Sequence, residues 1–297
     1  MILRPSPWGS PVAIADAHVH FFSHRFFELL ALQKPGLTFE SLPWQMPPER
    51  PEDLANIWAH EMDRHGVARA AIISSIPGDE ESVVTAVAAF PERFFAYAMV
   101  NPLQWQPVKW QPMNVDVACL FPAMHRYSIQ SEEAARVFHW AEENNKALFV
   151  HCGVLSVGVR KKLGLESLFD MRFSNPIDLH AVALRYPTVP IVVPHFGAGY
   201  FREALMLADL CPNVYLDTSS SNNWVRYEHL DLRHVFRRAL DVVGPHRLLF
   251  GTDSSFFPRG WHHQIFDEQA RVLYELNLSI EDARAIFGEN LLRILAH

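Results

Sequence analysis

The sequence predicts an α/β protein, specifically a (β/α)8 barrel, and three observations lead to this fold class. Short apolar runs alternate about eight times with amphipathic segments along the chain. The runs are continuous rather than alternating, as in parallel strands that are buried on both faces. The first run ends in histidines, not in the glycine-rich turn that would open a doubly wound sheet. The chain has 297 residues, of which 49% are hydrophobic, so we expect one barrel domain over residues 1–297.

Each expected strand is a short run rich in β-branched and aromatic residues. The eight strands are expected at residues 12–17, 68–74, 94–100, 117–121, 147–151, 190–195, 213–218 and 247–252. Helices are expected between and after them, at residues 51–66, 79–90, 131–144, 176–186, 200–210, 232–243, 262–276 and 279–287, with a helical tail after them.

The helix expected at 51–66 has a sequence signal at each end. Pro51 stands at its first position, Glu52 and Asp53 follow in the first turn, and Gly66 is suited to a left-handed C-cap. Two connections lack such signals. Residues 34–50 are proline-rich and predict a long loop, while residues 105–116 have no helical stripe, so the connecting helix there is expected to be degenerate.

Composition excludes several classes of function. The formal net charge is −7, with 33 acidic and 26 basic residues, and no run of Lys or Arg offers a face for nucleic acid or an anionic membrane. No apolar run approaches the length of a membrane helix, and the N-terminus lacks the apolar core of a secretion signal. Three cysteines without a CxxC pair indicate a reducing compartment, so we expect a cytoplasmic protein.

Five residues with ligand or proton-transfer chemistry stand at the ends of expected strands. His18 and His20 end the first strand, His151 the fifth, His195 the sixth and Asp253 the eighth. Because active sites of barrels lie at the carboxyl ends of their strands, these side chains are expected at one mouth.

A metal site explains this set. His18 and His20 are two residues apart on a strand, so their side chains point the same way and can bind one cation. His151 and Asp253 would complete a site of three nitrogens and one oxygen, which suits Zn²⁺, with Mn²⁺, iron or cobalt as alternatives. Each residue alone is weak evidence, since single histidines and turn aspartates are often structural.

Four motifs in order along the chain resemble the amidohydrolase superfamily, in the amidohydrolase-related branch that holds aminocarboxymuconate-semialdehyde decarboxylase, resorcylate-type decarboxylases and lactonases. The closing segment Phe-Gly-Glu-Asn-Leu resembles the last motif of that branch. The resemblance covers essentially the whole chain. The motifs lie at residues 16–20, 149–153, 193–197 and 249–253, and the closing segment at 287–291.

The resemblance implies a (β/α)8 barrel with one divalent metal, usually zinc. Its ligands would be His18, His20, His151 and Asp253, and His195 would transfer protons near the metal-activated water. Dinuclear relatives use a carboxylated lysine at the end of strand four, whereas residues 117–121 contain none. Many relatives of the branch carry a lysine–histidine pair near that strand, where this chain has Cys119 and Phe121, so substrate contacts on that side remain open.

Three functions remain at this point. The leading hypothesis is hydrolysis of a lactone or another carboxylic ester-like bond by metal-activated water, with His195 or Asp253 moving the proton. The second is non-oxidative decarboxylation of an aromatic or muconate-like acid by the same metal and residues; Asp16 matches only loosely the carboxylate that precedes the histidine pair in some of these decarboxylases. The third, of another class, is a metal-free or catalytically silent barrel that binds a ligand.

Substrate contacts are expected from loops at the mouth. Arg126 and Arg259 could hold a substrate carboxylate, as could three further arginines, although for each arginine alone a solvated surface position is the more common role. Trp44 and Trp261 could wall the pocket, and residues 34–50 are either a lid or a loop packed on the rim. The expected partner is therefore a small, carboxylate-bearing molecule; the oligomeric state stays open, with a homodimer among the states that the resemblance implies. The three further arginines are Arg160, Arg172 and Arg226.

Overall fold

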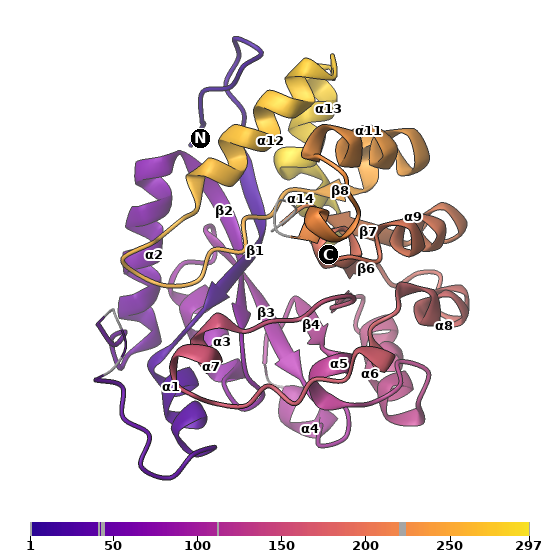
Figure 1. Ribbon diagram of the computed structural model, residues 1–297. Coiled ribbons are helices and arrows are strands. Elements are labelled where there is room, and N and C mark those ends of the chain that lie inside the picture. Colours follow the sequence, from indigo (N-terminus) through magenta and orange to yellow (C-terminus); the bar gives the residue numbers. More distant parts are fainter. Residues whose placement is uncertain (1, 41, 43–44, 112, 220–223, 297) are drawn as a thin grey trace.

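The computed structural model describes residues 2–40, 42, 45–111, 113–219 and 224–296. Eight parallel strands form one sheet in the order in which they occur in the sequence, and helices lie around the outside of the strands (Figure 1). This confirms the predicted (β/α)8 barrel. The strands are β1 (Ile14–Phe21), β2 (Val67–Ser74), β3 (Phe94–Val100), β4 (Val117–Leu120), β5 (Ala147–Val150), β6 (Ile191–Val193), β7 (Val214–Asp217) and β8 (Leu248–Leu249).

The sheet closes on itself where β1 meets the segment that follows β8. Ala17 N donates to Phe250 O at 2.8 Å, and His20 N donates to Ser254 O at 2.7 Å. Asp253 N donates in the opposite direction, to His18 O, at 2.9 Å. This seam, which we define by those three hydrogen bonds, brings the first and last strands of the barrel together.

Side chains of the strands divide into an inner and an outer layer, as the alternation of strand residues requires. Tyr97, Cys119 and Phe149 belong to the cluster that fills the barrel. Ile72 and Leu148 belong to the larger cluster between the strands and the surrounding helices. Both layers are buried, which is why the strands are continuous apolar runs in the sequence.

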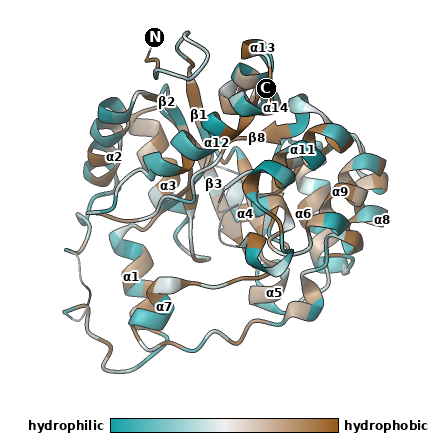
Figure 2. Cartoon of the chain, turned by 45° about the horizontal axis from the view of Figure 1, so that its top comes forward, coloured by the Kyte–Doolittle hydropathy of each residue, from teal (hydrophilic) through white to brown (hydrophobic). Residues whose placement is uncertain are grey.

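The helices cover the barrel with amphipathic faces, and α2 alternates hydrophilic and hydrophobic surfaces in Figure 2. In the parts of the chain that the structure describes, no helix combines the length and apolarity needed to cross a membrane. The helices are α1 (His24–Ala31), α2 (Pro51–His65), α3 (Glu80–Ala89), α4 (Pro107–Trp110), α5 (Pro122–His125), α6 (Glu132–Glu143), α7 (Gly158–Lys162), α8 (His180–Arg185), α9 (Phe201–Leu210), α11 (Leu232–Val243), α12 (His263–Glu275), α13 (Ile280–Arg284) and α14 (Asn290–Leu295).

The predicted helix ends match where a cap could be read from the sequence. Pro51 opens α2, and Gly66 closes it with a φ of 69°. Ser131 caps α6 by accepting a hydrogen bond from Ala134 N. The connection at 105–116 contains only the single turn α4 in its described part, as expected, and Trp105, Trp110 and Trp140 pack edge to face there.

Helix α1 and the ends of strands β1 and β8 are among the elements that differ from the prediction. Helix α1 was not expected; Ser23 caps it by accepting from Phe26 N. Strand β1 continues through His18 and His20 to Phe21, while β8 has only two residues, because the chain after it leaves the extended conformation. The described residues of segment 34–50 form neither helix nor strand, in agreement with the predicted loop, and Leu42 packs on a small apolar cluster with α1 and α7.

Candidate metal centre

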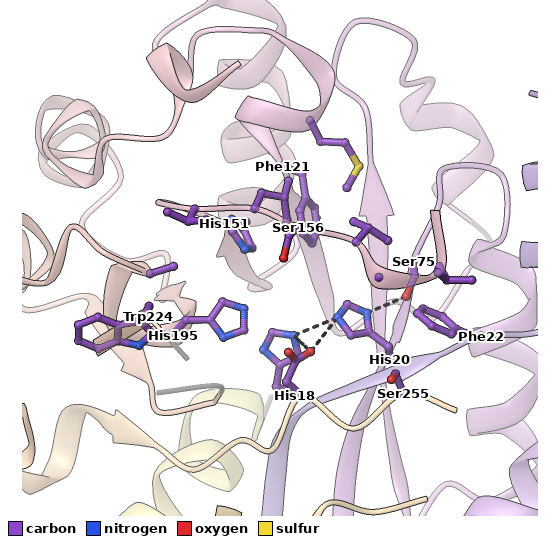
Figure 3. A pocket seen from close by; sticks show the side chains of 18 of the residues that line it. His18, His20, Phe22, Ser75, Phe121, His151, Ser156, His195, Trp224 and Ser255 are labelled. Atoms are coloured by element: carbon purple, nitrogen blue, oxygen red, sulfur yellow. Dashed lines mark hydrogen bonds and ion pairs between the residues drawn. The ribbon is translucent and has the colours of Figure 1, made fainter. Parts of the chain in front are cut away.

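Three of the predicted ligands, His18, His20 and Asp253, converge at the mouth of the barrel, and Figure 3 labels the two histidines. His18 Nε2 lies 3.4 Å from His20 Nε2 and 3.7 Å from Asp253 Oδ1. His20 Nε2 lies 3.2 Å from the same carboxylate oxygen. All three atoms lie within 4.8 Å of one another. Two imidazole nitrogens and one carboxylate oxygen in this arrangement form a donor set for one divalent cation.

The backbone of two elements places these side chains. The register of β1 shifts between Asp16 and Val19, and such a bulge re-aims side chains. Val19 packs outward, whereas His18 and His20 line the cavity at the mouth. Asp253 has a φ of 56°, and its backbone N–H donates to His18 O. Asp253, whose backbone conformation is strained, is thus held directly beside β1.

Each histidine of the pair has a partner behind it that selects its tautomer. His18 Nδ1 lies 2.7 Å from Asp217 Oδ2, and a carboxylate can only accept a hydrogen bond. His20 Nδ1 lies 2.7 Å from Ser75 Oγ, whose proton is directed to Ile73 O at 3.2 Å. His18 therefore carries its proton on Nδ1, and His20 can do the same, so that each Nε2 is able to present a lone pair to a cation, as metal-ligating histidines do.

Electrostatics around the cluster favour an ionised Asp253 and a neutral His20, while Asp217 favours the protonated form of His18, whose Nε2 proton a cation would have to displace. Burial alone would raise the pKa of Asp253, but the nearby His20 and His18 rings lower it overall, so the carboxylate stays ionised. Burial lowers the pKa of His20. For His18, burial also opposes the charged form, but the charge of Asp217 raises its pKa overall. The residues present fit a divalent cation.

His151 lies in the wall of the same cavity, outside the group of three converging atoms. It follows β5 directly, is 4% exposed, and stacks on Phe121 with the ring centroids 5.3 Å apart. Its Nδ1 is buried and has no hydrogen-bond partner among the described residues. Burial lowers its pKa well below the usual value, so the ring is neutral and able to donate a lone pair.

His195 lies beside the cluster in the turn Pro194–Gly197, which follows β6. Its φ of 56° is unusual for a residue with a side chain, and such strain tends to occur at functional positions. The ring of His195 lies 4.8 Å from that of His18, measured between centroids. Burial lowers its pKa, so the neutral ring can accept a proton.

Three polar residues behind the cluster were missed by the sequence analysis: Asp217, Ser219 and Ser75. Asp217 ends an expected strand, the same signal that selected Asp253, so it could have been found. Ser219 Oγ lies 3.0 Å from His18 Nδ1 and 2.8 Å from His195 Nδ1. The two serines carry no signal of their own in the sequence, because their role depends on which strand lies next to them.

A cavity of about 460 Å³ opens above the cluster. Its walls are largely apolar and aromatic, and Figure 3 labels Phe22, Phe121 and Trp224 among them. Its rim carries three cationic side chains, Lys162, Arg226 and Arg259. We call these three residues the cationic rim. The cavity has the size and polarity of a small-molecule site.

The predicted substrate contacts do not all lie at the cavity. Arg259 lines the cavity, and its Nη2 donates to Asp253 O at 2.9 Å and to Ser255 Oγ at 3.0 Å. Arg126 lies outside this cavity and donates from Nε to Leu168 O at 2.6 Å, so the structure does not place it beside the cluster. Trp44 lies outside the described residues.

The prediction for Trp261 also has to be corrected. Trp261 is a core residue and does not form a wall of the cavity. Its side chain is 1% exposed and packs against Phe250 and Phe266. Its Nε1 donates to Asp16 Oδ2 at 2.7 Å. Asp16 also accepts from Thr252 Oγ1 at 2.6 Å, and burial raises its pKa to about 6. Asp16 and Trp261 thus tie β1 to the chain that follows β8.

Comparison with known proteins agrees with this geometry. A model of the family described as amidohydrolase matches residues 15–296. Among curated proteins, protein fluG of Emericella nidulans is 33% identical over 133 residues, which are 45% of this chain and 14% of that protein. The chain therefore spans only a small part of the length of this relative.

Several solved structures share the fold over 96% of this chain and 99% of their own. 5-Carboxyvanillate decarboxylase LigW from Sphingomonas paucimobilis has a TM-score of 0.64 at 13% identity. A probable 2-pyrone-4,6-dicarboxylic acid hydrolase from Acinetobacter baumannii has 0.62 at 12% identity. An amidohydrolase from Burkholderia multivorans with bound zinc has 0.61 at 18% identity. At these identities the likeness shows a common fold.

Proposed function

This chain belongs to the amidohydrolase family, and we propose from that premise that it is a mononuclear metal-dependent hydrolase acting on a carboxylate-bearing lactone or another carboxylic ester-like bond. The observation that carries the proposal is the convergence of His18 Nε2, His20 Nε2 and Asp253 Oδ1 within 4.8 Å. Their partners leave both nitrogens available to a cation. The donor set supports Zn²⁺, with Mn²⁺ as the alternative, and His151 would be the fourth ligand.

The chain's own residues supply proton transfer beside the cation site. A bound divalent cation would act as a Lewis acid that activates water and polarises a carbonyl. His195 is neutral, and Ser219 O, 3.0 Å from its Nδ1, accepts the proton of that nitrogen. Its Nε2 can therefore accept a proton from water and return it to the leaving oxygen. Asp253, which stays ionised, is a second proton acceptor at the same place.

The cationic rim supports an anionic substrate. Lys162, Arg226 and Arg259 all line the cavity, whereas Asp253 is the one carboxylate among its described lining residues. Lys162 Nζ lies 5.4 Å and Arg259 Cζ 5.3 Å from the centroid of the Phe256 ring, so both cations are held at one place. A substrate carboxylate between them would orient its carbonyl toward the cluster. A hydrolase of a pyrone dicarboxylic acid among the structural neighbours is in keeping with this substrate class.

Non-oxidative decarboxylation of an aromatic or muconate-like acid is the second candidate, and the aromatic wall of the cavity favours it. Phe22, Phe121 and Trp224 would enclose a planar ring. The same cation and His195 would serve both reactions, since decarboxylation requires a proton on the ring carbon before carbon dioxide leaves. The decarboxylase among the structural neighbours is in keeping with this alternative.

A substrate screen distinguishes the two. The purified protein, loaded with Zn²⁺ or Mn²⁺, is assayed with carboxylated lactones and with aromatic acids, by acid release in one set and by carbon dioxide release in the other. We expect lactone turnover that is lost in His195→Gln and retained in His139→Gln, a substitution of an exposed histidine on α6. Carbon dioxide release without lactone turnover would replace the hydrolase by the decarboxylase. No turnover in either set would favour a ligand-binding barrel.

The compartment and the oligomeric state also belong to this proposal. All three cysteines are free and buried, which supports a reducing compartment and thus the cytoplasm. The oligomeric state stays open, and a homodimer is one of the states that the family resemblance implies. Light scattering of the purified chain would measure its mass directly.

A further inference from the structure

Ser219 touches both a proposed metal ligand and the proposed proton-transfer residue. We propose that Ser219 is a positioning residue that fixes the tautomer and ring orientation of His195 relative to His18. The proposal rests on the proposed function, because that function assigns the roles of these two histidines. The observations that support it are the hydrogen bonds around Ser219.

The Ser219 side chain lies between the two imidazoles. Its Oγ is 2.8 Å from His195 Nδ1 and 3.0 Å from His18 Nδ1. Its backbone oxygen is 3.0 Å from the same His195 nitrogen. One residue thus contacts His195 twice and His18 once. The two rings lie 4.8 Å apart at an interplanar angle of 33°.

The positions of the protons follow from the acceptors around each nitrogen. Asp217 Oδ2 accepts from His18 Nδ1, and Ser219 O accepts from His195 Nδ1; neither oxygen can donate. Both Nδ1 atoms therefore carry protons, and Ser219 Oγ lies within hydrogen-bonding distance of each of them. Both Nε2 atoms are left with free lone pairs. The lone pair of His195 is the one that the proposed proton transfer needs.

Ser219 can act in this way because it is itself fixed in place. It is fully buried, and its backbone N–H donates to Asp217 Oδ1 at 2.6 Å. On the other side, a Cβ at Gly251 would come within 3.0 Å of Ser219 Cβ and within 2.7 Å of Asp217 Oδ1. The serine therefore fills a tight space between β7 and the chain after β8. Replacement of Ser219 by alanine keeps the hydrogen bond from its backbone N–H to Asp217 and removes only the hydroxyl that contacts both histidines.

His195 needs this outside support. It stands in a turn after β6 with a φ of 56°, and the following Phe196 also has a positive φ of 51°. Among the residues that the structure describes, Ser219 provides both polar contacts of the His195 ring. Without the hydroxyl, His195 Nδ1 retains only the Ser219 backbone oxygen, which keeps the tautomer, but the ring gains freedom to turn.

The tautomer of His195 is measured directly by ¹⁵N imidazole NMR of the histidine-labelled, full-length protein, before and after loading with Zn²⁺. His195→Gln assigns the signal. We expect the Nδ1–H tautomer in the wild type and also in Ser219→Ala, because the Ser219 backbone oxygen still accepts that proton, but a shifted and broadened Nδ1 signal in Ser219→Ala, because the hydroxyl contact is lost. Ser82→Ala, which removes a buried hydroxyl on α3, is the matched control and should leave the signal unchanged. A wild-type Nε2–H tautomer, or an unchanged signal in Ser219→Ala, would overturn the proposal.

Turnover gives the second measurement once the screen has identified a substrate. In Ser219→Ala we expect kcat to fall about 10- to 100-fold, with KM within about twofold and the bound Zn²⁺ stoichiometry unchanged. A fall in metal content instead would make Ser219 a structural support of His18 and contradict the proposal. If no substrate is turned over, the proposed function fails, while the NMR result still decides the role of Ser219.

Discussion

Asp217 is the residue on which the orientation of His18 depends. Its carboxylate accepts the Nδ1 proton of His18 at 2.7 Å and is fully buried. We expect Asp217→Asn to lower the affinity for Zn²⁺ about 10- to 100-fold, the usual effect of removing such a partner. The reason is that an amide can also donate a hydrogen bond, so it no longer enforces the Nδ1–H tautomer. A chelator competition titration measures the affinity.

The control for this substitution is Asp209→Asn, which changes an exposed carboxylate at the end of α9. It should bind Zn²⁺ as the wild type does. Equal affinities for wild type and Asp217→Asn would mean that His18 is oriented by other contacts, and would remove Asp217 from the account of the metal centre.

Among single residues, those that face the cavity are easier to predict from the sequence than those that lie behind them. His18, His20 and Asp253 follow from their places at strand ends and from chemistry alone, and the structure brings them together. Ser219 acquires its role only because β7 lies next to β6, a tertiary relation that no local pattern encodes. Trp261 was misplaced because a predicted mouth loop can still turn its side chain into the core.

Among the elements, the junction of α1 and α3 contains a buried carboxylate that makes stability depend on pH. Asp79 accepts from Ser23 Oγ, which caps α1, at 2.8 Å and from Ser82 Oγ on α3 at 2.5 Å. Burial raises the pKa of Asp79 from 3.8 to about 7. The folded state therefore binds the proton more tightly than the unfolded state, and folding is disfavoured as the carboxyl ionises.

We expect the contribution of Asp79 to the free energy of unfolding to fall as pH rises from about 4 to about 7, and to change little outside that window. The shift corresponds to at most about 4 kcal/mol. Asp79→Asn should remove this loss of stability. The free energy of unfolding of the variant, relative to that of the wild type, should therefore increase with pH. Urea unfolding at several pH values measures it, with Asp53→Asn on α2 as the exposed control. A difference between Asp79→Asn and wild type that is independent of pH would contradict the assignment.

Element boundaries were predictable where a cap or a proline marks them. Helix α2 has Pro51 and Gly66 at its two ends, and both positions were correct. Strand β8 was expected to be longer, because the apolar run continues to Phe250 while the chain already turns toward Asp253 to reach β1. Helix α1 was missed because its eight residues follow directly on a strand whose aromatic run continues into it.

For the molecule as a whole, the candidate metal centre lies across the seam of the barrel. His18 and His20 belong to β1, whereas Asp253 follows β8, so a cation bound by all three would link the first and last strands. Removing it with a chelator should lower stability, by about 2.7 kcal/mol if the free metal had been at 100 times its Kd. Amide hydrogen exchange should accelerate at Ala17, His20 and Asp253.

Amides of the β4–β5 pair, away from the seam, serve as the internal reference and should change less. Uniform acceleration along the whole barrel would mean that the cation stabilises the fold without linking these strands. No change on chelation would mean that no cation is bound there.

The measurement that tests the central claim most directly is the metal content of the purified protein by elemental analysis, beside that of the His18→Ala/His20→Ala double variant. We predict about one equivalent of zinc or manganese in the wild type and none in the variant, because the two Nε2 atoms are needed to hold the cation. Wild-type protein without metal after reconstitution, or equal metal content in both proteins, would contradict the claim.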